Sequence, residues 1–373
     1  MQSLYIHFPF CLKKCAYCAF NSYPMGEIDF KAWLEKYLVA LNSFADNMDK
    51  KPLSSIYFGG GTPSLMPEFM LAELVENAEK ILGFSDNIEI SIEANPNTIN
   101  QNMVNGIKNA GINRLSIGIQ SFNDKELTFL GRIHNVKEAL QAFEIAHKTF
   151  QNISIDLIYG LPEQTLDDWH KNLEQALTLK CPHYSLYQLS IEKGSLLETR
   201  KLPAVDDDTA LNMLKLNQSL LKTEDIQQYE VSNYALSGYE CRHNILGWQG
   251  YDYIGIGAGA CSRITSDHKF LSIIQEANPQ KWFDNPQDMI CETLTPITRA
   301  EELVILGLRL HEGINSNVFY QNCGKNLLDV IDEKVLSDFC ESNLLIFEDN
   351  ILKTTESGLL VLDYLLLKLL KTL

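Results

Sequence analysis

Short runs of strand-forming residues alternate with longer amphipathic runs through the first half of this chain, and no other feature constrains the possible folds as strongly. The predicted strands cover residues 4–8, 55–58, 88–93, 114–119, 153–158 and 184–189. The predicted helices between them cover residues 30–44, 71–82, 103–110, 137–149 and 168–177. Strands that are regularly separated by helices form βα units and a parallel sheet. Six such units predict an α/β fold, a partial (βα)6 version of the TIM-like barrel.

Cysteine, glycine and polar residues stand at the C-terminal ends of these strands, where barrels of this kind carry their functional groups. Such residues are poor choices for packing alone, so they predict a binding site. In chain order they are Cys11, Cys15 and Cys18 after the first strand, Gly59, Gly60, Gly61 and Thr62 after the second, Glu93 at the end of the third, Gln120 at the end of the fourth and Asp156 late in the fifth.

The first three cysteines are closely spaced, in the pattern Cys11-x-x-x-Cys15-x-x-Cys18. Thiolates are the standard ligands of iron–sulfur clusters, and a 4Fe–4S cube normally takes four of them. Three thiolates on one loop leave one iron open to a ligand that is not part of the protein. Two alternatives stay open, namely a zinc site with His7 as its fourth ligand, or three unrelated buried cysteines.

The other cysteines are scattered singly, and the total of nine is odd. This distribution argues against a disulfide framework and for a reducing compartment, so we expect a cytoplasmic protein. The formal charge of −17 repels phosphate backbones, which argues against nucleic acid as a partner. We see no signal peptide and no transmembrane segment. The leucine-rich stretch 359–373 is too short and too charged to span a bilayer, and we expect a buried helix there.

The regular alternation of predicted strands and helices ends at about residue 200. A helix is expected from Asp206 to about Lys222, because acidic residues favour a helix N-terminus. A segment rich in glycine and aromatic residues follows at 229–263, and a polar stretch at 278–286 resembles a boundary. The remainder is mostly helical, with a short hairpin near 344–352. The sequence thus predicts a core at 1–225, a connecting segment at 226–285 and a smaller, helical, winged-helix-like domain at 286–373.

The motif Cys-x-x-x-Cys-x-Tyr-Cys resembles the signature of the radical S-adenosylmethionine (SAM) superfamily. The resemblance implies a 4Fe–4S cluster on the three cysteines, whose open iron binds the amine and carboxylate of SAM. Electron transfer from the cluster then cleaves SAM to a 5′-deoxyadenosyl radical, while the protein positions and shields the cofactors. The implied SAM contacts are Tyr5, Tyr17, Gly60, Gly61, Thr62, Glu93, Gln120, Arg132 and Asp156. Each polar member also fits an ordinary salt bridge, but the set on successive strand ends favours a site.

Further segments resemble the coproporphyrinogen-III-oxidase-like group within that superfamily. They lie at residues 5–11, 58–64, 93–96, 114–122, 130–134, 156–162, 187–192, 232–235 and 255–260, so the resemblance runs nearly end to end. The oxidase branch carries an N-terminal extension and a further cysteine two places after the third. In this chain the first predicted strand begins almost at Met1. The residue two places after the third cysteine is Phe20. Both features are similar to the other branch, the HemW haem chaperones.

This second resemblance implies a protein that carries haem as cargo and delivers it to recipient haem proteins, such as respiratory-chain enzymes, without oxidase activity. It also implies a homodimer. Two alternatives stay open. The first is a radical SAM enzyme acting on a tetrapyrrole, such as the oxygen-independent coproporphyrinogen III oxidase. The second is a cluster-bearing scaffold or sensor with no role in haem transfer.

A His-Asn-x-x-Tyr-Trp segment is associated with haem binding in the chaperone branch. In this chain the segment begins at His243 and ends at Trp248, with Gly247 in place of the tyrosine. Relatives commonly carry histidine at the position of Cys261. The resemblance implies His243, Trp248 and Cys261 as haem contacts, since imidazole and thiolate bind haem iron and indole is a good planar neighbour. Alternatively His243 is a structural histidine and Cys261 a small inert core residue.

Overall fold

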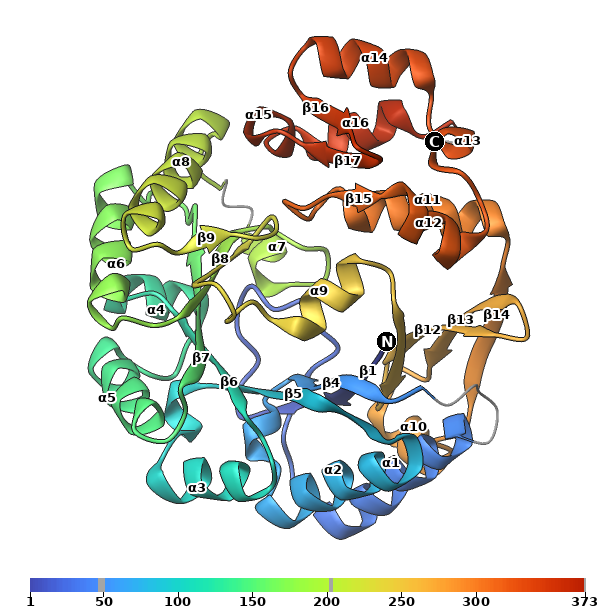
Figure 1. Ribbon diagram of the computed structural model, residues 1–373. Helices are drawn as coiled ribbons and strands as arrows, with labels where there is room; N and C mark the ends of the chain where they lie inside the picture. Colours follow the sequence, from blue (N-terminus) through green and yellow to red (C-terminus); the bar gives the residue numbers. More distant parts are fainter. Residues whose placement is uncertain (46–50, 201–203, 372–373) are drawn as a thin grey trace.

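A twelve-stranded sheet dominates the computed structural model, which describes residues 1–45, 51–200 and 204–371 (Figure 1). Its strand order is β14-β13-β12-β11-β1-β4-β5-β6-β7-β8-β10-β9. The six central strands are β1 (Gln2–Phe8), β4 (Leu53–Gly60), β5 (Phe84–Ala94), β6 (Arg114–Gln120), β7 (Asn152–Tyr159) and β8 (His183–Gln188). Each pairs in parallel with the next. The predicted α/β fold with a partial (βα)6 barrel is therefore confirmed.

Helices cover the outside of the curved sheet (Figure 1). They are α1 (Phe30–Ala45), α2 (Glu68–Leu82), α3 (Gln101–Asn109), α4 (Asp124–Leu130), α5 (Val136–His147), α6 (Leu166–Thr178) and α8 (Asp207–Thr223). The short α7 (Leu196–Arg200) packs instead on the cysteine loop, where the Leu197 N–H donates to the Ala16 carbonyl oxygen. Short 3-10 turns follow β4 and β5, at Pro63–Leu65 and Pro96–Thr98. The short helix α4 was not predicted. Its first turn is held by Asn123, whose side chain accepts a hydrogen bond from the Lys125 backbone N–H.

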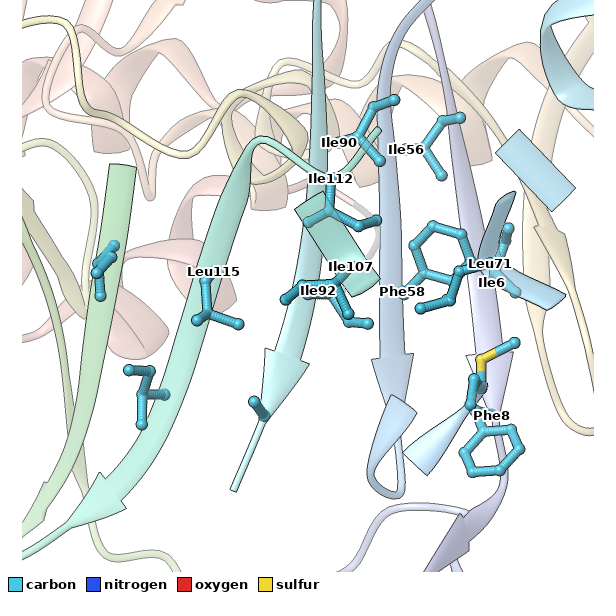
Figure 2. Close-up of a cluster of buried hydrophobic side chains, with 14 of the residues drawn as sticks. Ile6, Phe8, Ile56, Phe58, Leu71, Ile90, Ile92, Ile107, Ile112 and Leu115 are labelled. Atoms are coloured by element: carbon cyan, nitrogen blue, oxygen red, sulfur yellow. The ribbon is translucent and has the colours of Figure 1, made fainter. Parts of the chain in front are cut away.

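Apolar and polar residues alternate along the six parallel strands, and the apolar set faces the helices. Figure 2 shows Ile56 and Phe58 of β4 and Ile92 of β5 on the same side of the sheet as Leu71 and Ile107 from the helices. The intervening residues face the interior of the barrel and bond to one another across the strands. The hydrophobic core therefore lies between sheet and helices, and the inside of the barrel is polar.

The segment 226–285, which we expected to connect two domains, adds strands to both edges of the main sheet. β9 (Gln227–Gln228) and β10 (Asn233–Ala235) extend it beyond β8, whereas β11 (Asp252–Ile256), β12 (Cys261–Ser266), β13 (Lys269–Gln275) and the following β14 (Met289–Leu294) extend it beyond β1. Glycine in β11 has a packing role, because a Cβ on Gly255 would lie 2.1 Å from the carbonyl oxygen of Cys261. Where a boundary was expected, α10 (Pro279–Asp284) buries Trp282 against Trp33.

One helix of this segment, α9 (Arg242–Trp248), lies within the ring of strands and contacts β1, β4 and α11 (Figure 1). Its first turn faces the inside of the barrel, where the backbone N–H of His243 approaches a carboxylate oxygen of Glu89 at 3.4 Å. The helix therefore brings His243, from the segment 226–285, into contact with the polar interior of the barrel.

The C-terminal region has a hydrophobic core of its own, centred on Leu303, Val304, Phe319, Leu352 and Leu365. Its elements are α11 (Pro296–Gly307), β15 (Ile314–Asn315), α12 (Ser316–Cys323), α13 (Leu327–Val330), α14 (Glu333–Glu341), β16 (Leu345–Glu348), β17 (Ile351–Thr354), α15 (Glu356–Leu359) and α16 (Leu362–Leu369). The predicted hairpin is confirmed as the antiparallel pair β16–β17. No helix in the described ranges has the length and apolar composition needed to traverse a lipid bilayer.

Candidate functional site

The C-terminal ends of the parallel strands surround a cavity of about 390 Å³. Nearly all of the residues that the sequence singled out as cluster or SAM contacts line it. They are Cys11, Cys15, Tyr17, Cys18, Gly60, Gly61, Thr62, Glu93, Gln120, Arg132 and Asp156. These residues come from five strands and the loops after them, which converge because parallel strands end at the same edge of a sheet.

The three cysteines lie on the loop that follows β1. Cys11 ends β2 (Phe10–Cys11), which pairs with β3 (Tyr23–Pro24), so the loop is closed by a short two-stranded sheet. Cys11 is buried, whereas Cys15 and Cys18 are half-exposed. Burial, together with the neighbouring Cys15 and Cys18, raises the pKa of the Cys11 thiol to about 11. Three thiolates at this place therefore need a cationic partner such as iron.

The arrangement fits an iron–sulfur cluster better than a single zinc ion. Among the described residues, no three His, Cys, Asp or Glu side chains lie close enough together to hold one metal ion. Both ring nitrogens of His7 are engaged, with the Tyr5 hydroxyl at 2.9 Å and the Asn21 carbonyl oxygen at 2.9 Å. Zinc requires all its ligands on one ion, whereas a cube distributes its thiolates over separate irons. His7 is thus a structural histidine.

The glycine loop after β4 packs directly on the cysteine loop. A Cβ on Gly61 would lie 2.4 Å from the carbonyl oxygen of Phe10, and Gly60 has a φ of 110°. The backbone N–H of Gly60 donates to Glu93 at 3.2 Å, and the Thr62 hydroxyl accepts from Asn95 at 2.9 Å. Only glycine allows this close approach, which fixes the loop after β4 against the loop that carries the thiols.

Two carboxylates, Glu93 and Asp156, face the cavity. Glu93 accepts hydrogen bonds from the Tyr57 hydroxyl at 3.0 Å, and Asp156 accepts from the Ser116 hydroxyl at 2.9 Å. Burial, and then the charge of Asp156, raises the pKa of Glu93 to about 7, and burial also raises the pKa of Asp156. Two half-buried carboxyl groups that repel each other favour a cationic ligand, such as an ammonium or sulfonium group.

Arg132 joins the carboxylate side of the cavity to the cysteine loop. Its guanidinium donates to the Asn95 side chain at 2.5 Å, to the Gly118 carbonyl oxygen at 2.6 Å and to the Cys15 sulfur at 3.4 Å. The buried Nε has no hydrogen-bond partner among the described residues. An orphaned donor at the wall of a cavity fits a ligand that brings an acceptor, such as a carboxylate.

Gln120 also lines the cavity, at the end of β6 where the pairing with β7 shifts register. Its φ of 73° is unusual for a residue other than glycine. Backbone strain of this kind is found mostly where a side chain must be aimed at a ligand. The geometry therefore agrees with the predicted role of Gln120.

Tyr5 lies within β1 and does not line this cavity. Its hydroxyl bonds to His7 Nδ1, and its ring stacks on Tyr57 at 6.3 Å. A direct contact of Tyr5 with a ligand in the cavity finds no support in this geometry. Its position beside Tyr57 makes it part of the floor instead.

The three residues singled out as haem contacts lie in different surroundings. His243 faces the barrel interior, where Nδ1 bonds to the Ser55 hydroxyl at 3.1 Å and the ring stacks on Tyr57 at 5.0 Å. Trp248, at the other end of α9, lies under the guanidinium of Arg309 and lines a second cavity, of about 570 Å³, against the C-terminal region. Cys261 begins β12 and is half-exposed.

Several residues of the first cavity were not predicted from the sequence. They are Lys13, Lys14, Ala19, Phe20, Ser22, Ala94, Asn95, Gly118, Ile158, Tyr187, Gln188, Leu189, Ser190 and Glu192. Asn95 and Tyr187 were detectable, since both stand at strand ends within segments that carry the family resemblance. The lysines and Phe20 belong to the cysteine loop, whose path depends on its packing on the glycine loop.

Comparison with known proteins gives consistent matches. Residues 5–176 match the Radical SAM superfamily, and residues 294–361 match the HemN C-terminal domain. The chain is 37% identical to the Heme chaperone HemW of Haemophilus influenzae, over 98% of this chain and 96% of that protein. It is 33% identical to the Heme chaperone HemW of Bacillus subtilis, over 97% of each.

Further matches agree. The mitochondrial Radical S-adenosyl methionine domain-containing protein 1 of Bos taurus is 34% identical, over 100% of this chain and 88% of that protein. Among solved structures, the coproporphyrinogen III oxidase (HemN) of Escherichia coli superposes with a TM-score of 0.83, covering 100% of this chain and 90% of that one. At 22% identity this last likeness supports the fold alone.

Proposed function

Because the chain belongs to the HemW family of radical SAM proteins, we propose that it is a haem chaperone, which holds a 4Fe–4S cluster and SAM and delivers haem to recipient proteins. One observation carries the cofactor part of this proposal. Three thiols, two carboxyl groups that favour a cation and an arginine with an unpaired donor all face a single cavity. The haem part is supported by the identity to the HemW proteins over nearly their full length.

Each part of the cavity has a proposed role. Cys11, Cys15 and Cys18 would hold the cluster, and Arg132 would offset the negative charge of the thiolates through its contact with Cys15. Glu93 and Asp156 would bind the cationic end of SAM, with Tyr17, Gly60, Gly61, Thr62 and Gln120 shaping the remaining wall. When both cofactors are bound, they supply one-electron reduction chemistry. The protein's own contribution is to bind, orient and shield them.

The chaperone proposal is tested by separating haem transfer from oxidase chemistry. Phe20, two places after Cys18, lines the cavity and is 66% exposed, but it offers no metal ligand and no exchangeable proton. We expect reconstituted protein to bind haem and pass it to an apo-haem protein. Given SAM, a reductant and coproporphyrinogen III, it should form no protoporphyrinogen IX. Sustained, SAM-dependent decarboxylation in that assay would replace the chaperone by the enzyme alternative.

His243 is the proposed axial ligand of haem, whereas Trp248 and Cys261 lie in other surroundings and stay predictions from the family resemblance. Its Nδ1 is taken by Ser55, which leaves Nε2 for iron. Burial, and then the charge of Arg114, lowers the pKa of His243 to about 4, so the imidazole is neutral as an iron ligand must be. We expect His243→Ala to shift the Soret band and to weaken haem binding at least about tenfold, or 1.4 kcal/mol.

The matched control for that measurement is His147→Ala, since His147 is exposed and stacks on Phe143 far along the chain from α9. It should leave the haem spectrum and affinity as in the parent. An unchanged Soret band in His243→Ala would instead point to Cys261 or another histidine as the ligand.

We also propose the cytoplasm as the location, which is supported by nine cysteines that are all free of disulfide bonds. Respiratory-chain recipients and a homodimer stay predictions from the family resemblance. The negative charge of the chain argues against nucleic acid as a further partner.

A further inference from the structure

A chain of hydrogen bonds runs through the interior of the barrel and ends on Asp156, and the proposed function makes no use of it. The hydroxyl of Ser154 donates to Asp156 at 3.3 Å and lies 2.7 Å from Nδ1 of His183. Nε2 of His183 lies 2.8 Å from the hydroxyl of Tyr229. That hydroxyl accepts the backbone N–H of Cys241, the residue before α9, at 3.2 Å. Ser154 and His183 are completely buried.

The partners allow one continuous direction of donation along these hydrogen bonds. Burial, and then the charge of Arg114, lowers the pKa of His183, so its ring is neutral and carries one N–H. The Tyr229 oxygen already accepts from Cys241, and its own O–H is available to donate to Nε2. The ring N–H of His183 is then on Nδ1 and donates to Ser154. In this arrangement each hydroxyl or N–H donates toward the carboxylate.

We propose that His183 and Tyr229 are positioning residues for the SAM cavity, which act through Ser154 to hold Asp156 as a carboxylate aimed at a cationic ligand. Aligned donors polarise one another in a buried setting, so the effect of the chain on Asp156 exceeds that of Ser154 alone. The inference rests on the proposed function, because SAM is the cation considered. The inference goes beyond the proposed function because it assigns a role to residues that do not line the cavity.

Other charged and titratable groups also act on Asp156, and their effect must be separated from that of the hydrogen-bond chain. Glu93 repels it, and Arg114 and the hydroxyls of Ser116 and Ser185 favour its charged form. The remaining neighbours are the groups whose ionisation Asp156 opposes. They are Tyr57 and Cys181, together with Tyr187, whose side chain is exposed. A substitution that leaves all these groups in place isolates the contribution of the hydrogen-bond chain to the charged form of Asp156.

Tyr229→Phe is that substitution, because it removes one hydroxyl three hydrogen bonds away from Asp156. We expect SAM to bind about threefold to tenfold more weakly, the range for one lost hydrogen bond transmitted to a charged group. The pH at which SAM binding reaches half its maximum should rise, since a carboxyl group with weaker donors holds its proton to higher pH. Cluster iron content should match the parent.

Tyr234→Phe is the matched control. Tyr234 lies on the nearby strand β10 and is buried, and its hydroxyl has no hydrogen-bond partner among the described residues. It should leave both the affinity for SAM and its pH profile unchanged. A pH profile separates the proposal from a loss of packing, because a merely structural change lowers affinity equally at all pH values.

Ser154→Ala provides a second variant should Tyr229→Phe fold poorly, and it should shift the pH profile in the same direction. The inference is wrong if Tyr229→Phe and Ser154→Ala both bind SAM with the parent's affinity and pH profile. If the parent itself does not bind SAM, the proposed function fails first, and the two failures are thereby distinguished.

Discussion

Replacing any one of Cys11, Cys15 and Cys18 by alanine is expected to lower the iron bound by reconstituted protein from about four atoms per chain to near zero. Two thiolates cannot hold a cube that already lacks a fourth protein ligand. The loop brings all three thiols to one cavity, where burial and then the neighbouring Cys15 and Cys18 raise the pKa of the Cys11 thiol and so favour metal binding for its thiolate. Iron analysis and the thiolate-to-iron absorption band measure the loss.

Four cysteines elsewhere in the chain serve as controls for this experiment. Cys291 is exposed on β14, and its replacement should change neither iron content nor stability. Cys181, Cys323 and Cys340 lie in or against the hydrophobic cores, so alanine there should reduce stability but leave the iron in place. Full iron content in a triple Cys11, Cys15 and Cys18 variant would contradict the assignment of the cluster.

Glu93→Gln is expected to weaken SAM binding about tenfold to a hundredfold at about pH 8, the range for removing a charged partner from a hydrogen-bonded pair. Because the pKa of Glu93 is raised to about 7, the parent should lose affinity for SAM as the pH falls through about 7. The variant has no proton to gain at this position, so that part of its pH dependence should disappear. Titration calorimetry across this pH range tests both effects.

The same substitution should affect the stability of the cofactor-free protein in the opposite sense. A carboxyl whose folded pKa lies above its usual 4.5 destabilises the folded state once the pH exceeds both values. Glu93→Gln should therefore unfold at a higher temperature than the parent above about pH 7, and the gain should vanish toward about pH 4. Glu192→Gln is the control, since Glu192 lines the same cavity but is exposed. Equal SAM affinity and melting temperature in Glu93→Gln and the parent would remove Glu93 from the site.

Local pattern was sufficient to predict the six central strands and the residues at their ends. An apolar and polar alternation of four to six residues identifies a strand by itself, and the barrel rule then places its end at the site. The attachment of the outer strands to this sheet depends instead on pairing between distant segments, of β10 with β8 and of β11 with β1. β11, for example, contains Gly255, and glycine has a low propensity for strands. It is recognisable only through its parallel pairing with β1.

The limits of the site prediction have a similar cause. Tyr5 is a SAM contact that the family resemblance implies, but in the structure its hydroxyl contacts His7 and its ring stacks on Tyr57. His183 and Tyr229 belong to strands and turns that are distant in sequence, and no motif links them. Their hydrogen bond exists only because β10 returns antiparallel to β8 and brings Tyr229 across the end of the barrel.

The alternation along the parallel strands has a consequence for how this protein tolerates change. Residues that stabilise the fold, such as Ile92, and residues that face the site, such as Glu93, are neighbours in sequence but lie on opposite faces of one strand. Substitutions on the inner face can therefore alter ligand preference at little cost in folding. A single inserted or deleted residue within a strand would exchange the two faces, placing carboxylates in the core and isoleucines in the cavity. Variation in such a barrel is thus expected as point substitutions on its inner face and length changes in its loops.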